Sequence, residues 1–134
     1  INRGLPLPLK SINNLRSFVA LDNLIDCIIL CSKHPDAAGE RFLVSDDDDI
    51  STPRLVELIA ESLGKSASMF SLPPSLLVCA ARLIGKSYFA TRLCGSLQVD
   101  IEKTCCCLGW QPRITAAEGV RIAVQGWRSN NLIA

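Results

Sequence analysis

The sequence holds few of the side chains that most often transfer protons or bind metals. It has one histidine, His34, and one tyrosine, Tyr88, in 134 residues. A single histidine excludes the zinc motifs that need a His pair, and we interpret His34 as a structural residue of an exposed turn. Arg92 stands four residues after Tyr88, where a Tyr-x-x-x-Lys proton-transfer pair would need lysine. The residues alone therefore predict no complete catalytic centre.

Glycine-rich loops, long apolar runs and a strong net charge are also missing. The eight glycines form no G-x-G or G-x-x-G pattern, which excludes a loop that cradles phosphate with backbone N–H groups. The uncharged stretch 69–81 contains Pro73 and Pro74 and is too short to cross a bilayer. A net charge of +1 gives no bulk attraction to nucleic acid or to an anionic membrane. We expect neither as a partner.

Cysteine, by contrast, is abundant: there are seven, at positions 27, 31, 79, 94, 105, 106 and 107. The odd number, the lack of a secretory leader and the irregular spacing indicate reduced thiols in a cytoplasmic protein. Neighbouring residues on a helix point about 100° apart, so the run Cys105–Cys107 cannot converge on one metal ion. We interpret the three as small apolar packing residues.

The composition is that of a folded domain, with 49% apolar and 20% charged residues. Extended segments are predicted at residues 4–9, 16–21, 41–45, 67–73 and 96–100. Helical patterns are found at residues 22–33, 51–64, 74–85, 100–109 and 114–130. The helix at 74–85 should be largely buried, and residues 86–95 should be irregular. We predict one domain, residues 1–134, of the mixed α+β class, with short strands and three to four helices.

Helix starts carry capping signals. N-caps are predicted at Asp22, Ser51 and Asp100. Thr115, with Glu118 three residues later, forms a capping box. These signals fix where the chain enters its predicted helices.

The acidic run Asp46–Asp49 follows a predicted strand. A calcium loop would need carboxylates that alternate with spacers and a later glutamate, so we interpret the run as a solvated loop. Trp110 and Trp127 occupy apolar positions beside or within predicted helices, and we expect both to pack in the core.

The best candidates for binding are basic: Arg16, Arg92 and, less so, Lys103. A guanidinium group grips phosphate oxygens with two parallel hydrogen bonds and stays charged at physiological pH. Two arginines from separate segments would suit a diphosphate. The alternative, that they are ordinary surface residues or partners of Asp22 and Asp100, stays open at this point.

Three stretches, in order, resemble the extended short-chain dehydrogenase/reductase family, the group of NAD-dependent nucleotide-sugar epimerases and dehydratases. RSFVALDNLIDCI resembles its R-[DS]-[FY]-[IV]-x-V-x-D-L segment, and GERFLVSDDDDISTPRLVELIAESLGK its next strand and helix. VDIEKTCCCLGWQPRITAAEGV is similar to its closing L-G-W-x-P signature. The nearest branch is UDP-glucose 4-epimerase-like and includes enzymes of bacterial polysaccharide synthesis that act on UDP-N-acetylhexosamines.

The resemblance implies that residues 1–134 are only the C-terminal, nucleotide-sugar-binding part of such an enzyme. The NAD site and the Tyr-x-x-x-Lys pair would lie on an N-terminal Rossmann domain that this chain lacks, so the fragment alone should be inactive. Its partners would be a UDP-sugar and that Rossmann domain. A homodimer is among the assemblies that the resemblance allows for the parent enzyme.

The resemblance also implies roles for single residues. Arg16 matches the family arginine that contacts the substrate phosphates, and Arg92 matches a second phosphate- or nucleoside-binding arginine. Pro8 and Leu9 would lie near the uracil, while Lys103 would brace its short helix. A 4-reductase or 4,6-dehydratase of the same family, or a non-catalytic binding module, are the alternatives to an epimerase.

Overall fold

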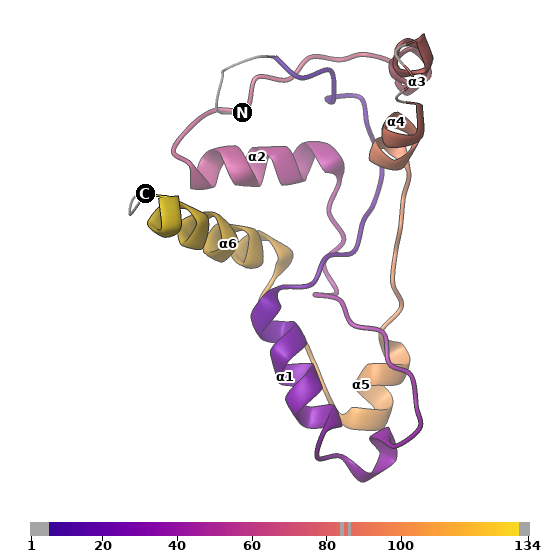
Figure 1. The fold of residues 1–134 in the computed structure, drawn as a ribbon, viewed down its shortest axis with the longest axis vertical. Coiled ribbons are helices and arrows are strands. Elements are labelled where there is room, and N and C mark those ends of the chain that lie inside the picture. The colour runs from indigo at the N-terminus through magenta and orange to yellow at the C-terminus, as the bar shows by residue number, and fades with distance from the viewer. Residues whose placement is uncertain (1–5, 84, 86, 132–134) are drawn as a thin grey trace.

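The structure, a computed structural model, describes residues 6–83, 85 and 87–131 (Figure 1). Its helices are α1 (Leu21–Cys31), the 3-10 helix η1 (Pro35–Ala37), α2 (Thr52–Ser62), α3 (Pro74–Leu83), α4 (Ser87–Cys94), α5 (Glu102–Leu108) and α6 (Ala116–Asn131). The prediction of three to four helices is wrong, because this part of the chain forms six α-helices. Helix α4 lies where an irregular segment was predicted.

The predicted short strands are not confirmed in the described residues. The extended segments meet only at isolated bridges, which join Leu7 to Met69 and join Arg16 to both Ile50 and Leu97. A single bridge holds two segments together without the ladder of hydrogen bonds that defines a sheet. The described part is therefore mainly helical, with extended connections, rather than the mixed α+β fold expected. Residues 4 and 5 of the predicted segment 4–9 lie outside the described residues.

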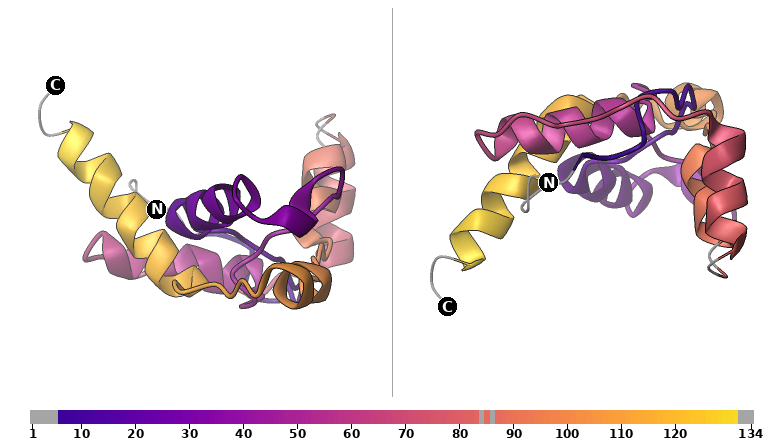
Figure 2. Two further views of the ribbon diagram at one scale, coloured as in Figure 1. Left: turned by 90° about the horizontal axis from the view of Figure 1, so that it is seen from below. Right: turned by 90° about the horizontal axis from the view of Figure 1, so that it is seen from above.

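Seven of the ten buried apolar residues form two separate clusters. One lies between α1 and α5 and consists of Cys27, Ile101, Leu108 and Trp110. The other lies between α2 and α6, which run side by side in the upper part of Figure 1, and consists of Ile50, Leu58 and Ala116. The two views of Figure 2 show α3 and α4 as a helical hairpin at the edge of the molecule, packed against each other.

The joint between the two clusters is polar and depends on Asp46. This side chain is 5% exposed. Its carboxylate accepts hydrogen bonds from the backbone N–H of Ala20 at 2.9 Å and from the side-chain amide of Asn23 at 2.6 Å. The side-chain oxygen Oδ1 of Asn23 accepts in turn from the backbone N–H groups of Arg113 and Ile114. The start of α1, the acidic turn and the segment before α6 therefore meet at one buried network.

This network corrects two expectations. The acidic run is not wholly solvated, since Asp46 is buried and Asp49 accepts hydrogen bonds from Ser17 at 2.6 Å and from Gln98 at 2.7 Å. The N-cap of α1 is not Asp22, because the helix begins at Leu21 and its first turn faces the carboxylate of Asp46. A carboxylate at a helix N-terminus is favoured whichever part of the chain supplies it.

Most of the other start and stop signals hold, but the N-cap of α5 is Ile101 rather than the predicted Asp100. Ser51 accepts a hydrogen bond from the N–H of Arg54, and Thr115 accepts one from Glu118. Asp100 accepts from the N–H of Glu102, the first residue of α5, at 2.8 Å. Glycines with positive φ follow α2 and α5, as expected for helix ends.

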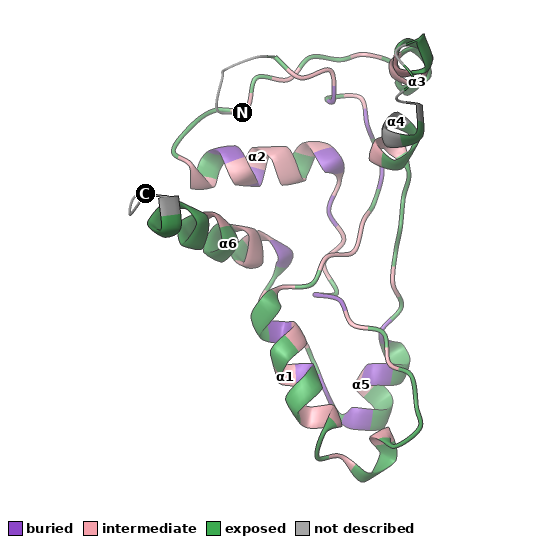
Figure 3. Ribbon diagram, viewed as in Figure 1, coloured by how far each residue is buried: buried purple, intermediate pink, exposed green. Residues whose placement is uncertain are grey.

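Burial departs from expectation at two helices. Trp110 is in the core at 5% exposed, as predicted, but Trp127 on α6 is 54% exposed. Helix α3 has no buried residue, and its Leu76 and Leu83 are exposed (Figure 3). Both helices lie at the edge of the described part, where few other elements cover them.

Helix α6 approaches the start of α1 so closely that a glycine is required. A Cβ atom at Gly119 would lie 2.9 Å from the Cβ of Ala20, whereas one at Gly126, on the same helix, would meet nothing within 4 Å. We expect Gly119→Ala to lower the free energy of unfolding by about 1–2 kcal/mol, because overpacking outweighs the gain in helix propensity. The matched control Gly126→Ala should raise it by about 0.5–1 kcal/mol. Urea denaturation of both variants tests this, and a stabilised Gly119→Ala would contradict it.

Candidate functional site

The backbone of Arg16 is held on both sides by neighbouring extended segments. Its N–H and carbonyl exchange hydrogen bonds with Ile50, each at 3.1 Å. On the other side, the N–H of Ser17 donates to the carbonyl of Leu97, and the N–H of Leu97 donates to the carbonyl of Leu15, both at 2.9 Å. Arg16 therefore projects from a fixed stretch of backbone, although the strand predicted there is not regular.

The structure brings Arg16 to the end of α4, which carries Arg92. The Nη1 of Arg16 lies 3.4 Å from the carbonyl oxygen of Arg92, across 76 positions of sequence. The guanidinium of Arg92 lies 5.5 Å from the centre of the Tyr88 ring, one turn earlier, and its Nη1 is 3.5 Å from the tyrosine hydroxyl. Such stacking of a cation on an aromatic ring is favourable. The two predicted arginines are thus neighbours.

Neither arginine is neutralised within the described part of the chain. Other basic side chains there form ion pairs: Arg54 with Glu57 and Glu61, Lys103 with Glu40, and Arg113 with Asp26. No described carboxylate lies within 4.0 Å of the guanidinium nitrogens of Arg16 or Arg92. The alternative that they pair with Asp22 and Asp100 therefore fails.

Lys103, the third basic candidate, is not part of this group. Its Nζ lies 2.6 Å from the carboxylate of Glu40 and 5.3 Å from the centre of the Phe42 ring. The hydrogen bond and charge of each partner lower the pKa of Glu40 and raise that of Lys103. Lys103 ties α5 to the segment before the acidic turn.

Pro8 and Leu9 lie on a segment that pairs with residues 68–70 rather than with the segment of Arg16. Hydrogen bonds join Leu7 to residues 68 and 70, both at 2.9 Å. Leu9 is 8% exposed and belongs to the buried residues, whereas Pro8 is half-buried. The structure does not bring these two residues together with the arginines.

Sequence reasoning missed Asn14, the polar residue that joins these elements. Its side chain is 2% exposed and hydrogen bonds to Thr52 at the start of α2 and to the carbonyls of Leu93 and Gly95 at the end of α4. An asparagine two positions before a predicted binding arginine was the available signal. Its partners, however, are far away in sequence.

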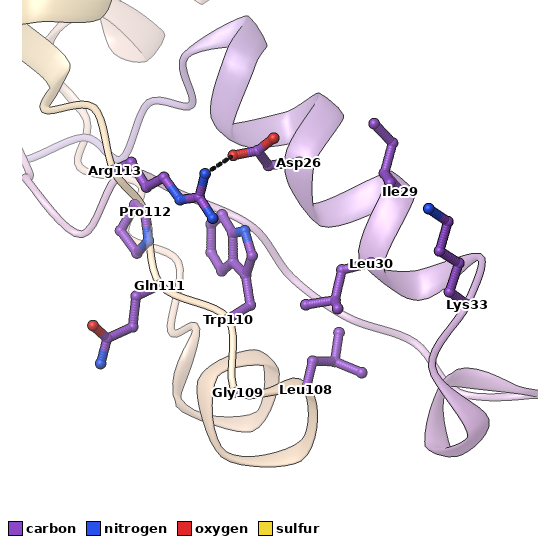
Figure 4. A pocket seen from close by; sticks show the side chains of 10 residues that line it. All are labelled: Asp26, Ile29, Leu30, Lys33, Leu108, Gly109, Trp110, Gln111, Pro112 and Arg113. Atoms are coloured by element: carbon purple, nitrogen blue, oxygen red, sulfur yellow. Dashed lines mark ion pairs between the residues drawn. The ribbon is translucent and has the colours of Figure 1, made fainter.

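A separate cavity of about 670 Å³ lies between α1 and residues 108–113 (Figure 4). Apolar side chains such as Leu30 and Pro112 line it, and the ion pair of Arg113 with Asp26, at 3.5 Å, crosses its rim. Neither Arg16 nor Arg92 borders it. Asp26 and Arg113 are engaged with each other, and Lys33 and Gln111 are the other polar residues that line the cavity.

No cluster of the described residues is suited to a metal, and none of the helices in those ranges is long and apolar enough to span a membrane. All seven cysteines carry free thiols. Cys105 packs against the cluster that contains Cys27, as a small apolar residue would. Cys106 and Cys107 are exposed, so the packing role predicted for them is wrong.

Burial, and then the neighbouring Cys31, raise the pKa of Cys27 to about 11. With a pKa of about 11, Cys27 is almost wholly protonated at pH 8. Only the thiolate form reacts. We expect iodoacetamide at pH 8 to alkylate the exposed Cys106 and Cys107 while Cys27 stays unmodified, as measured by peptide mass spectrometry. In the urea-unfolded control all seven should react. Alkylation of folded Cys27 at the rate of Cys107 would contradict its burial.

Comparison with known proteins identifies a relative. UDP-glucose 4-epimerase of Vibrio cholerae is 41% identical to this chain over 132 residues, which make up 98% of the chain and 40% of that enzyme. The chain thus spans two-fifths of the length of the relative. No protein-family profile and no solved structure matches it. The resemblance predicted from three short motifs is confirmed: over almost its whole length this chain is similar to part of a UDP-glucose 4-epimerase.

Proposed function

We propose that this chain is the C-terminal, UDP-sugar-binding domain of an NAD-dependent UDP-sugar 4-epimerase. The similarity to a UDP-glucose 4-epimerase supports the enzyme class. The observation that carries the binding role is the meeting of Arg16 and Arg92 at the end of α4, with no described carboxylate within 4.0 Å of either guanidinium.

Arg16 contacts the backbone carbonyl of Arg92, so the two cations project from neighbouring segments, and an anion shared between them would be stabilised by both charges. A diphosphate suits them, because each guanidinium offers planar, paired N–H donors to phosphate oxygens. Arg16 directs one guanidinium nitrogen to the backbone carbonyl of Arg92. Because a guanidinium has five N–H donors, the others remain for phosphate oxygens. The fixed backbone of Arg16 and the stacking of Arg92 on Tyr88 reduce the entropy lost on binding. We name this pair, Arg16 and Arg92, the phosphate clamp.

Pro8 and Leu9 take a secondary place in the proposal. Pro8 is half-buried and would lie beside the uracil. Leu9 is buried and would act by holding the segment in place rather than by touching the base.

The catalytic step would belong to the remainder of the enzyme. This chain has no glycine-rich turn for the NAD pyrophosphate and no Tyr-x-x-x-Lys pair, so its residues do not fit the cofactor, and the chain by itself would be inactive. Its part would be to hold the UDP group while the sugar reacts. A 4-reductase or 4,6-dehydratase would use the same hold.

The burial pattern supports a missing partner domain. On α1, Leu21, Ile25, Ile28 and Ile29 are between 42% and 69% exposed, and their spacing places them on one side of the helix. An apolar stripe of this kind normally packs against another element. We propose that the N-terminal Rossmann domain covers it.

The clamp is tested by Arg16→Ala in the longer protein that contains this chain. Removal of a charge-assisted contact to phosphate should weaken UDP-sugar binding by about 1.5–3 kcal/mol, as measured by isothermal titration calorimetry. Arg54→Ala is the matched control, since Arg54 is paired with Glu57 and Glu61 on α2. The affinity of this variant for the UDP-sugar should be unchanged. Wild-type affinity in a folded Arg16→Ala protein would refute the clamp.

The covered stripe is tested by the double variant Ile25→Ser and Ile28→Ser. In the longer protein the loss of two buried side chains should lower the free energy of unfolding by at least about 3 kcal/mol. In the isolated chain, where the stripe is exposed, the same change should reduce binding of a hydrophobic dye and leave stability nearly unchanged. Equal effects in both proteins would rule out a domain contact at α1.

A further inference from the structure

We infer that Asn14 is a positioning residue for the phosphate clamp: it fixes the end of α4, and with it Arg92, against the segment that carries Arg16. The inference deepens the proposed function and rests on it. The inference rests on the hydrogen bonds of the buried Asn14 side chain. None of the binding roles proposed above requires these hydrogen bonds.

The amide of Asn14 is engaged at both of its ends. Its Nδ2 donates to the hydroxyl of Thr52 at 2.9 Å and to the carbonyl of Gly95 at 3.0 Å, with the carbonyl of Leu93 further away at 3.3 Å. Its Oδ1 accepts from the backbone N–H of Thr52 at 2.9 Å. The hydroxyl of Thr52 donates to the carbonyl of Leu93 at 3.0 Å. One side chain thus links the start of α2 to the end of α4.

Only an amide meets these demands. The carbonyls of Leu93 and Gly95 can only accept, and the N–H of Thr52 can only donate, so the site needs a donor and an acceptor on one planar group. Aspartate would match in shape but would turn an acceptor toward two carbonyls. An apolar residue would leave buried polar groups unpaired, which is costly. The chemistry of the site therefore selects asparagine.

This link is a main attachment of the α3–α4 hairpin. The two helices pack chiefly against each other. The end of α4 is tied to the rest by Asn14 and Thr52, by the N–H of Leu15, which donates to the hydroxyl of Ser96 at 3.1 Å, and by the contact of Arg16 with Arg92. The last carbonyls of a helix have no partner within the helix, and Asn14 and Thr52 supply one here.

Asn14 therefore places one arginine and leaves the other alone. Arg16 keeps its position through its own bonds to Ile50 and through the pairing of its neighbours with Leu97. Arg92 depends on where the end of α4 lies. Without Asn14, the end of α4 loses two of its hydrogen-bonded ties and keeps those to Thr52, Leu15 and Arg16, so Arg92 is held less closely toward the phosphate that Arg16 would bind.

The test measures affinity for UDP, by calorimetry, on the longer protein that contains this chain. Asn14→Ala should weaken UDP binding about tenfold. The matched control is Asn23→Ala: Asn23 is 1% exposed and makes as many hydrogen bonds, but at the joint of α1 with residues 113–114. It should lose stability in urea denaturation and keep its UDP affinity.

A double-mutant cycle separates positioning from general damage to the fold. In an Arg92→Ala background, Asn14→Ala should weaken UDP binding less than twofold, because the group that it positions is gone. In an Arg16→Ala background, the effect of Asn14→Ala should persist. If Asn14→Ala does not fold, Thr52→Val, which removes the hydroxyl between Asn14 and Leu93, takes its place in the same cycle.

The outcomes distinguish this inference from the proposed function. If Arg16→Ala and Arg92→Ala both bind UDP like the wild type, the clamp is refuted, and the inference falls with it. If both arginine variants lose affinity but the loss from Asn14→Ala is absent, or is equal in every background, only the positioning role is overturned. If Asn14→Ala weakens UDP binding only in proteins that retain Arg92, the positioning role of Asn14 is established.

Discussion

The described structure depends on the buried carboxylate of Asp46. It accepts from the N–H of Ala20, the N-cap of α1, and from the side chain of Asn23, which in turn holds the chain just before α6. The apolar cluster of α1 and α5 and that of α2 and α6 have no residue in common, so a polar joint sets how they lie against each other. A buried carboxylate is tolerated because the N–H of Ala20 and the side-chain amide of Asn23 replace its water. The close approach of Gly119 to Ala20 is a consequence of the same joint.

A second polar joint, at Asn14, gives the candidate site its shape. Hydrogen bonds are directional, so an amide that binds the start of α2 and the end of α4 fixes their relative position more narrowly than apolar contacts would. Arg16 and Arg92 are brought together by this joint rather than by contact with each other's side chains. Under the proposed function, two cations held on separately anchored segments would form a preorganised place for an anion.

Under the proposed function, one further domain would account both for the exposed apolar residues and for the catalytic groups that this chain does not carry. Only ten apolar residues are buried in the described part, while fourteen large ones are exposed, which is the reverse of a self-sufficient core. The stripe on α1 lies on the element that follows Arg16 directly in sequence, so a domain that covers the stripe would also approach the phosphate clamp. Closure of the site and burial of the stripe would then be one event.

The sequence by itself determined the features that depend on neighbouring residues. The cap at Ser51, the capping box at Thr115 and the helix end at Gly109 were predicted correctly, because each uses partners within a few positions. The motifs also predicted the resemblance to UDP-glucose 4-epimerases, and they singled out Arg16 as a candidate binding residue. Only the tertiary structure decided that Asp46 is buried, that α4 is a helix, and that Asn14 and Arg16 meet its end. These features rest on hydrogen bonds between groups far apart in sequence, and no local pattern records which distant donor a carbonyl or carboxylate will find.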